Sequence, residues 1–138
     1  MTLSDTNLIL SDNAAPTHVG FLLIPGFALL AYASAAEPLR AANTLSGRTL
    51  YRWSHIAIDG IAATASNGVA ISADYGPFDA GRFDYVVVCA GGNPAAFHHP
   101  ATFAWLRQLA RRGVALGGVS GGPYILARAN LLGGYRCT

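Results

Sequence analysis

The stretch V-A-L-G-G-V-S-G-G-P-Y-I-L-A, residues 114–127, combines a short apolar run, a glycine-rich turn and the start of a helix. The run Val114–Val119 is apolar without alternation, which is typical of a strand covered on both faces of a parallel sheet. Gly121-Gly122-Pro123 interrupts the run, and proline is favoured in the first turn of a helix. A helical pattern then covers Tyr124–Ala129. The segment therefore predicts a buried strand, a tight turn and a helix.

The same order of strand, turn and helix occurs twice more in the chain. The apolar run from His18 to Ile24 is followed by helical spacing over Ala28–Asn43, although Pro38 should kink or shorten that helix. Tyr85–Ala90 is a second buried strand of this kind, and Ala101–Arg112 is the amphipathic helix after it. Three such units predict a doubly wound α/β fold with a mostly parallel sheet flanked by helices in a flavodoxin-like, three-layer arrangement.

Shorter signals complete the expected organisation. Tyr51–Asp59 predicts another strand, Asn67-Gly68 marks a hairpin turn, and Tyr135–Thr138 looks like the beginning of one more strand. Residues 1–17 are polar and without periodicity, so we expect a loose N-terminal arm there. We expect residues 18–138 to form a single domain, because a chain of this length has room for only one.

Composition and charge narrow the function classes. The chain is 52% hydrophobic and 12% charged, with a formal charge of +2, and its nine basic residues are scattered arginines. A nucleic-acid surface needs a basic stripe, so DNA binding is not expected within this segment. Cys89 and Cys137 form neither a disulfide framework nor a metal-ligand cluster, and no motif indicates a cofactor. Without a signal peptide or an apolar run long enough to cross a bilayer, we expect a cytoplasmic protein that does not contact membranes.

The glycine-rich turn satisfies G-x-S-x-G at Gly118–Gly122, the pattern of a nucleophile elbow. A serine in such an elbow reacts only when a base removes its proton. None of the 18 residues after Ser120 is His, Asp or Glu, and of the preceding histidines His98 and His99 are placed to reach the same sheet edge. Three roles for Ser120 stay open: a nucleophile with one of these histidines, an N-cap of the next helix, or a ligand contact.

Two other turns are expected beside Ser120. Gly91-Gly92-Asn93-Pro94 follows one strand and Pro25-Gly26-Phe27 follows another, and ligands of open α/β sheets bind outside the carboxyl ends of the strands. Neither turn has the spacing of a phosphate-binding loop, and Gly-Gly-Asn-Pro also suits an ordinary turn. The candidate ligand-binding residues are Phe27, Gly92, Asn93, Ser120 and Gly121.

Four stretches together resemble the class I glutamine amidotransferase-like, or PfpI-like, domain. They are F-L-L-I-P-G-F (Phe21–Phe27), A-A-E-P-L-R-A-A-N (Ala35–Asn43), V-V-V-C-A-G-G-N-P (Val86–Pro94) and G-V-S-G-G-P-Y-I-L-A (Gly118–Ala127). More narrowly, they resemble the N-terminal half of AraC-family transcription regulators that use this domain as a sensor. The resemblance implies a small-molecule effector, no cofactor and a homodimer.

The resemblance also implies lost catalysis. Catalytic members carry a cysteine where this chain has Ser120, and some use an acid just after the first strand, where residues 25–28 contain none. The histidine expected after the elbow would fall beyond Thr138 in relatives. Glu37, further along the helix, is interpreted as a structural residue. We therefore expect a vestigial elbow with no catalytic residue.

Regulators of this type carry a helix-turn-helix module after the sensor. The residues up to Thr138 have no room for one, so we expect a truncated chain whose DNA contacts come from a missing C-terminal module. The stretch Asn43–Trp53 is similar to the branch that responds to quaternary amines, such as carnitine or glycine betaine, or to amino acids. Phe27, Tyr32 and Trp53 could supply an aromatic cage for such a cation.

The leading interpretation is an effector-sensing and dimerisation domain that binds its ligand without covalent chemistry. One alternative is a serine hydrolase or amidohydrolase that uses Ser120 with His98 or His99. Another is a degenerate domain that serves only as a dimerisation platform.

Overall fold

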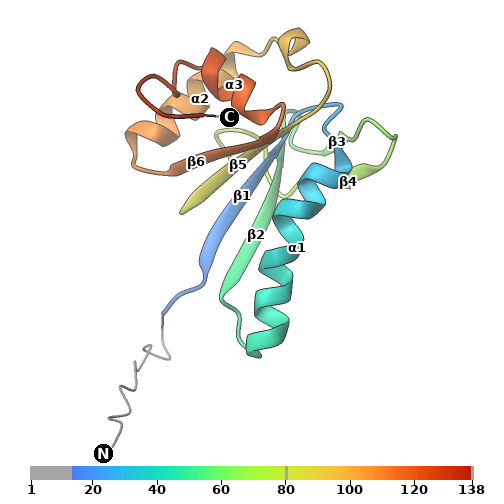
Figure 1. Ribbon diagram of the computed structural model, residues 1–138, viewed down its shortest axis with the longest axis vertical. Helices are drawn as coiled ribbons and strands as arrows, with labels where there is room; N and C mark the ends of the chain where they lie inside the picture. The colour runs from blue at the N-terminus through green and yellow to red at the C-terminus, as the bar shows by residue number, and fades with distance from the viewer. Residues whose placement is uncertain (1–13, 80, 138) are drawn as a thin grey trace, which may run out of the picture.

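In the computed structural model, which describes residues 14–79 and 81–137, a four-stranded parallel sheet forms the centre of the molecule (Figure 1). In spatial order its strands are β2 (Tyr51–Ala57), β1 (Thr17–Leu23), β5 (Tyr85–Ala90) and β6 (Ala115–Ser120). Each neighbouring pair runs parallel. These four strands lie where the sequence predicted strands, so the expected fold class is confirmed.

Helices cover both faces of this sheet. Helix α1 (Leu29–Ser46) packs on one face, and α2 (Pro100–Arg111) and α3 (Gly122–Arg128) pack on the other (Figure 1). Side chains alternate between the faces along each strand, which divides the core into two clusters. The α1 side contains Val19, Phe21, Leu23 and Cys89, and the opposite side contains Leu22, Ile56, Val86, Val88, Leu106 and Ile125.

The order of the strands creates a switch point. From β1 the chain moves through α1 to β2 at one edge, whereas from β5 it moves through α2 to β6 at the other edge. The loops after β1 and β5 therefore diverge to opposite faces of the sheet. In open α/β sheets the crevice at such a point, outside the carboxyl ends of the strands, is where ligands bind.

A small hairpin lies beside the sheet. Strands β3 (Ala62–Thr64) and β4 (Ala70–Ser72) pair antiparallel around the predicted Asn67-Gly68 turn, where Gly68 has a φ of +90°. The hairpin contacts the loop after β1 through a hydrogen bond of 2.8 Å from the amide of Gly26 to the carbonyl of Thr64.

The helix predicted to be disturbed by proline is continuous. Helix α1 passes through Pro38 without ending, so the expected shortening is wrong. Pro38 lies on the exposed side of the helix, where water can solvate the carbonyl that loses its amide partner. The helix ends at Gly47, whose φ of +65° and amide bond to the carbonyl of Thr44 form a normal C-terminal cap.

The two ends of the domain also differ from expectation. Thr17 already belongs to β1, and residues 1–13 of the expected N-terminal arm lie outside the described part of the chain. The strand expected at Tyr135 is wrong for the described residues 135–137, which form turn and irregular structure. Asn130 and Gly134, both at positive φ, turn the chain back over α3 and keep it from extending along β6.

No helix in the described ranges, 14–79 and 81–137, is long and apolar enough to span a membrane.

Candidate functional site

Three loops meet at the carboxyl edge of the sheet. The amide of Ile24, after β1, donates to the carbonyl of Cys89 at 2.9 Å, and the amide of Gly121, after β6, donates to the carbonyl of Ala90 at 3.3 Å. A Cβ on Gly121 would stand only 2.7 Å from the carbonyl oxygen of Gly91. The backbones of these loops are therefore in direct contact, and position 121 has no space for a side chain larger than that of glycine.

A cavity of about 310 Å³ opens between the loops after β1 and β5, at the switch point of the sheet. Its lining is Ile24, Pro25, Gly26, Ala90, Gly91, Asn93, Pro94, Ala96 and Phe97. We call this cavity the edge pocket. Asn93 has the one polar side chain of the lining, and its amide makes no hydrogen bond within the described residues. A mostly apolar pocket with a single free amide matches the usual make-up of a small-molecule site.

Ser120 has the backbone of an elbow. Its φ is +55°, a left-handed conformation that is uncommon and strained for a residue other than glycine, and its side chain is exposed. The N-cap of α3 is Gly121, which makes no side-chain capping bond. The interpretation of Ser120 as an N-cap is therefore wrong, because the turn places its hydroxyl outside the first turn of the helix.

The two histidines proposed as bases are engaged elsewhere. Nδ1 of His99 accepts hydrogen bonds from the amide and hydroxyl of Thr102, at 3.2 and 2.8 Å, and so caps α2. Nδ1 of His98 lies 3.3 Å from a guanidinium nitrogen of Arg128. Within residues 14–79 and 81–137, no side chain hydrogen-bonds the hydroxyl of Ser120. The described part of the chain thus gives this serine no base.

The first acidic residue after β1, Glu37, is also engaged elsewhere. Glu37 forms an exposed pair with Arg40 at 2.7 Å on the surface of α1. The hydrogen bond from the Arg40 guanidinium lowers the pKa of the Glu37 carboxyl. Glu37 is therefore an ionised surface residue that supports the helix, as its motif position suggested.

The thiol of Cys89 lies at the end of β5 but cannot replace the missing elbow cysteine. Its side chain is fully buried on the α1 side of the sheet. Burial raises the pKa of the Cys89 thiol to about 12. Because the thiolate is the reactive form, this cysteine is inert at neutral pH.

Of the five candidate ligand residues, only Asn93 lines the edge pocket. Gly121 packs against the loop that carries Asn93, and Ser120 is exposed beside that loop. Gly92 is also exposed, and a Cβ at position 92 would meet no atom within 4 Å. Phe27 is 0% exposed and packs edge-on against Tyr32, with ring centroids 6.2 Å apart. The side chain of Phe27 is thus part of the core.

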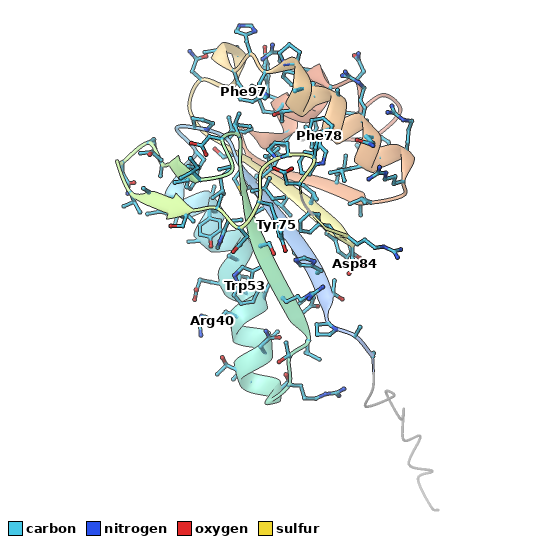
Figure 2. All side chains as sticks on the ribbon, turned by 180° about the vertical axis from the view of Figure 1, so that it is seen from behind. Arg40, Trp53, Tyr75, Phe78, Asp84 and Phe97 are labelled. Atoms are coloured by element: carbon cyan, nitrogen blue, oxygen red, sulfur yellow. The ribbon has the colours of Figure 1, made fainter. Side chains whose placement is uncertain are left out.

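The proposed aromatic cage does not gather at this edge. Trp53 pairs with Val19 near the start of the parallel strands, four residues before β2 ends at Ala57. At about 3.3 Å per residue this is roughly 13 Å from the carboxyl edge. Figure 2 shows Trp53 about halfway up the fold, beside α1, and Phe97 near the top of the view. Phe97, which the sequence analysis missed, is the aromatic ring of the edge pocket; its position just after the Gly-Gly-Asn-Pro turn was the available signal.

The sequence analysis also missed a chain of interacting polar side chains, Tyr32, His55 and Asp74, beside α1. The hydroxyl of Tyr32 lies 2.7 Å from Nε2 of His55, whose Nδ1 lies 3.7 Å from the Asp74 carboxylate. Desolvation lowers the pKa of His55, and the Asp74 charge opposes this in part. Desolvation also raises the pKa of Tyr32. These groups join α1, β2 and the segment after β4, and none of them lines the edge pocket.

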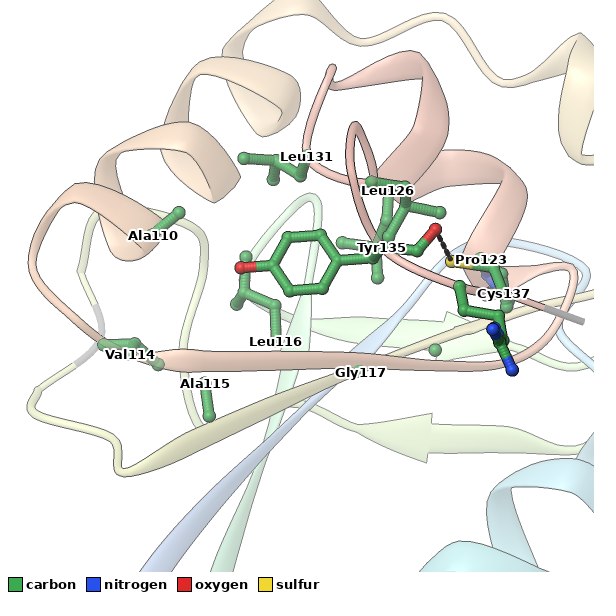
Figure 3. Close-up of a pocket in the computed structure, with 13 residues that line it drawn as sticks. Ala110, Val114, Ala115, Leu116, Gly117, Pro123, Leu126, Leu131, Tyr135 and Cys137 are labelled. Atoms are coloured by element: carbon green, nitrogen blue, oxygen red, sulfur yellow. Dashed lines mark hydrogen bonds between the residues drawn. The ribbon is translucent and has the colours of Figure 1, made fainter.

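A larger cavity, of about 560 Å³, lies away from these loops, between β6, α2, α3 and the last described residues (Figure 3). Its lining is mainly aliphatic and includes Leu116, Leu126 and Leu131, which belong to or pack on the core. The Tyr135 ring lies over β6 and points toward Ala110 and Val114 (Figure 3). The polar side chains of this cavity, Tyr135, Arg136 and Cys137, all belong to the last described residues, and the cavity lies away from the switch point between β1 and β5. We therefore take the edge pocket as the candidate site.

No group of His, Cys, Asp or Glu among the described residues is arranged to hold a metal ion.

The fold, with its strained elbow and paired glycine loops, is of the DJ-1/PfpI-like class. A solved DJ-1 superfamily protein from Agrobacterium tumefaciens superposes with a TM-score of 0.67 at 20% identity, covering 84% of this chain and 60% of that protein. An AraC family transcriptional regulator from Pseudomonas putida has a TM-score of 0.79 at 28% identity, covering 88% of this chain and 65% of that structure. No family model matches the chain.

A curated relative is more similar in sequence. The HTH-type transcriptional regulator GbdR of Pseudomonas aeruginosa is 44% identical over 127 residues, which are 92% of this chain and 35% of GbdR. The chain thus spans about a third of the length of this relative. It corresponds to the N-terminal portion of AraC-family helix-turn-helix regulators.

Proposed function

We propose that this chain is the effector-sensing part of an AraC-family transcription regulator and that it binds a small molecule, without covalent chemistry, in the edge pocket. The observation that carries the proposal is the position of that pocket. It lies at the switch point between β1 and β5 and presents the side-chain amide of Asn93, which no described residue hydrogen-bonds, among apolar and aromatic lining.

The state of Ser120 supports binding in preference to catalysis. A hydroxyl without a base is a weak nucleophile, and the two histidines proposed as bases, His99 and His98, are held at the N-terminus of α2 and against Arg128. The elbow still turns the Ser120 side chain outward, next to the loop that carries Asn93. Ser120 is therefore proposed as a ligand contact beside the pocket.

The proposed ligand class is a quaternary amine or an amino acid. The support is the likeness of Asn43–Trp53 to the branch that responds to such compounds, together with the Phe97 ring in the pocket wall. A cation on an aromatic face is stabilised by about 0.5–2 kcal/mol. Phe97 takes the place of the cage first expected from Phe27, Tyr32 and Trp53.

A thermal-shift screen of the purified chain against glycine betaine, carnitine and single amino acids tests the proposal. A true ligand at a hundred times its dissociation constant adds about 2.7 kcal/mol to the free energy of unfolding. Asn93→Ala should remove most of this ligand-induced increment. Asn67→Ala, in the β3–β4 turn, is the matched control and should keep it.

Two outcomes would overturn the proposal. Stoichiometric labelling of Ser120 by a fluorophosphonate, lost in Ser120→Ala, would establish the serine hydrolase alternative. A flat screen, in which neither the chain nor its variants respond, would favour a domain kept only as a dimerisation platform.

DNA contact and assembly belong to the same proposal. The relatives are helix-turn-helix regulators about three times as long as the matched segment, so we assign DNA binding to a part of such regulators outside the matched segment. A homodimer is proposed for the sensor, and light scattering coupled to size-exclusion chromatography measures it directly.

A further inference from the structure

A third cavity, of about 280 Å³, lies at the start of α2 and shares no lining residue with the edge pocket. It is lined by His98, His99, Pro100, Phe103, Arg107 and Arg128. We propose that this cavity, the cationic pocket, binds a small anion through a carboxylate or phosphate group. The proposal does not depend on the effector proposed for the edge pocket.

The two histidines present donors to the cavity. A guanidinium only donates, so Nδ1 of His98, 3.3 Å from Arg128, is the acceptor and its proton is on Nε2. Nδ1 of His99 accepts from the amide of Thr102, so its proton is on Nε2 as well. Both rings therefore have an N–H as their remaining polar group.

Arg128 is held in place by hydrogen bonds and has no carboxylate partner among the described residues. One of its guanidinium nitrogens donates to the carbonyl of Phe97 and, at 3.4 Å, to those of Pro94 and Ala95. The guanidinium carbon lies 5.0 Å from the centre of the Phe103 ring. These contacts orient the guanidinium but leave its charge unneutralised, since no carboxylate lines the cavity.

Arg107 adds a second positive charge. It projects from α2 into the lining and makes no hydrogen bond or ion pair with any residue of the described ranges. A cavity whose side-chain polar atoms are guanidinium and imidazole N–H donors is complementary to an anion and to no cation. Arginine forks match the paired oxygens of carboxylates and phosphates.

Titration of the purified chain with inorganic phosphate and with acetate, followed by NMR at constant pH and ionic strength, tests this proposal. We expect saturable shifts of the His98 and His99 ring signals with one or both anions. Saturation by phosphate alone assigns a phosphate-type ligand, and saturation by acetate assigns a carboxylate. Chloride at the same ionic strength should give no saturable shift.

Matched arginine variants separate a site from general charge effects. Arg107→Gln removes a lining guanidinium that makes no hydrogen bond or ion pair with any described residue. The substitution should weaken anion binding about tenfold, as expected for the loss of a charge-assisted hydrogen bond. Arg111→Gln, on the same helix but outside the lining, should leave the affinity unchanged. Equal weakening by both variants, or shifts that never saturate with either anion, would overturn the proposal.

Discussion

The carbonyl oxygen of Gly26 stands 2.1 Å from the point that a Cβ on Gly91 would occupy. Two turns separated by more than sixty residues in the chain therefore meet with no space for a side chain between them. This contact joins the loops after β1 and β5 and shapes one wall of the edge pocket, which both glycines line.

Gly91→Ala should destabilise the domain strongly. The added methyl group would overlap a backbone oxygen, which can move only with its loop, and such overpacking costs about 3 kcal/mol. Urea unfolding followed by circular dichroism measures the change. Gly92→Ala is the matched control, since a Cβ there meets no atom within 4 Å; its effect should stay within about 0.5 kcal/mol. Equal effects of the two substitutions would show that the loops do not touch as described.

Asn43→Ala should loosen the connection from α1 to β2. The Asn43 side-chain amide donates to the carbonyl of Tyr51 at 2.7 Å, and its oxygen accepts from the amides of Leu50 and Tyr51 at 2.8 and 3.0 Å. Losing these bonds should lower the free energy of unfolding by about 2 kcal/mol. Thr44→Ala, the neighbouring exposed position, should change it by less than about 0.5 kcal/mol. A neutral Asn43→Ala in the same urea series would contradict this role.

The strands and helices were predictable because their signals are local. Tyr85–Ala90 is apolar throughout, as a strand covered by α1 on one face and by α2 and α3 on the other must be, and its predicted bounds match the structure. The helix containing Pro38 and the segment from Tyr135 were not predictable. The first depends on which side of the helix meets water, and the second on how Asn130 and Gly134 turn the chain.

The candidate site was predictable only in its location. Because the carboxyl ends of parallel strands share one edge, the turns containing Gly26, Gly91 and Ser120 had to meet. Which side chains face the cavity depends on packing between distant segments. Phe27 turns into the core against Tyr32, and Phe97, which no motif marked, lines the pocket instead.

Ser54→Ala should leave a buried imidazole without a partner. The carbonyl of Arg82 accepts from Nδ1 of His18 at 2.8 Å, so Nε2 accepts from the hydroxyl of Ser54 at 2.9 Å, and both side chains are buried. The substitution should cost about 1–3 kcal/mol. A double-mutant cycle with His18→Phe should give a coupling energy of about 1 kcal/mol. Additive effects of the two substitutions would rule out the hydrogen bond.

Acid should destabilise the fold in part through His55. Its pKa is lowered in the folded state by desolvation, so its contribution to stability is present above the unfolded value of about 6.5 and is lost as the pH falls through the folded value. One such proton changes the free energy of unfolding by at most about 1.4 kcal/mol per pH unit. Between pH 7 and 5, His55→Gln should flatten the measured dependence, whereas His98→Gln at an exposed position serves as the control. An unchanged slope in His55→Gln would show that another group titrates.

The two thiols should differ sharply in reactivity. Burial raises the pKa of Cys89 to about 12, while Cys137 is exposed. With a thiol reagent at pH 8, Cys137 of the native protein should therefore react rapidly and Cys89 only after unfolding. Cys137→Ser should abolish the rapid phase. Because the folded pKa of Cys89 lies above its unfolded value of about 9, the contribution of this thiol to stability is full below pH 9 and is lost as the pH rises toward 12. Rapid labelling of Cys89 in the native Cys137→Ser variant would show that the end of β5 opens to solvent, and the edge pocket built on it would then have to be mobile as well.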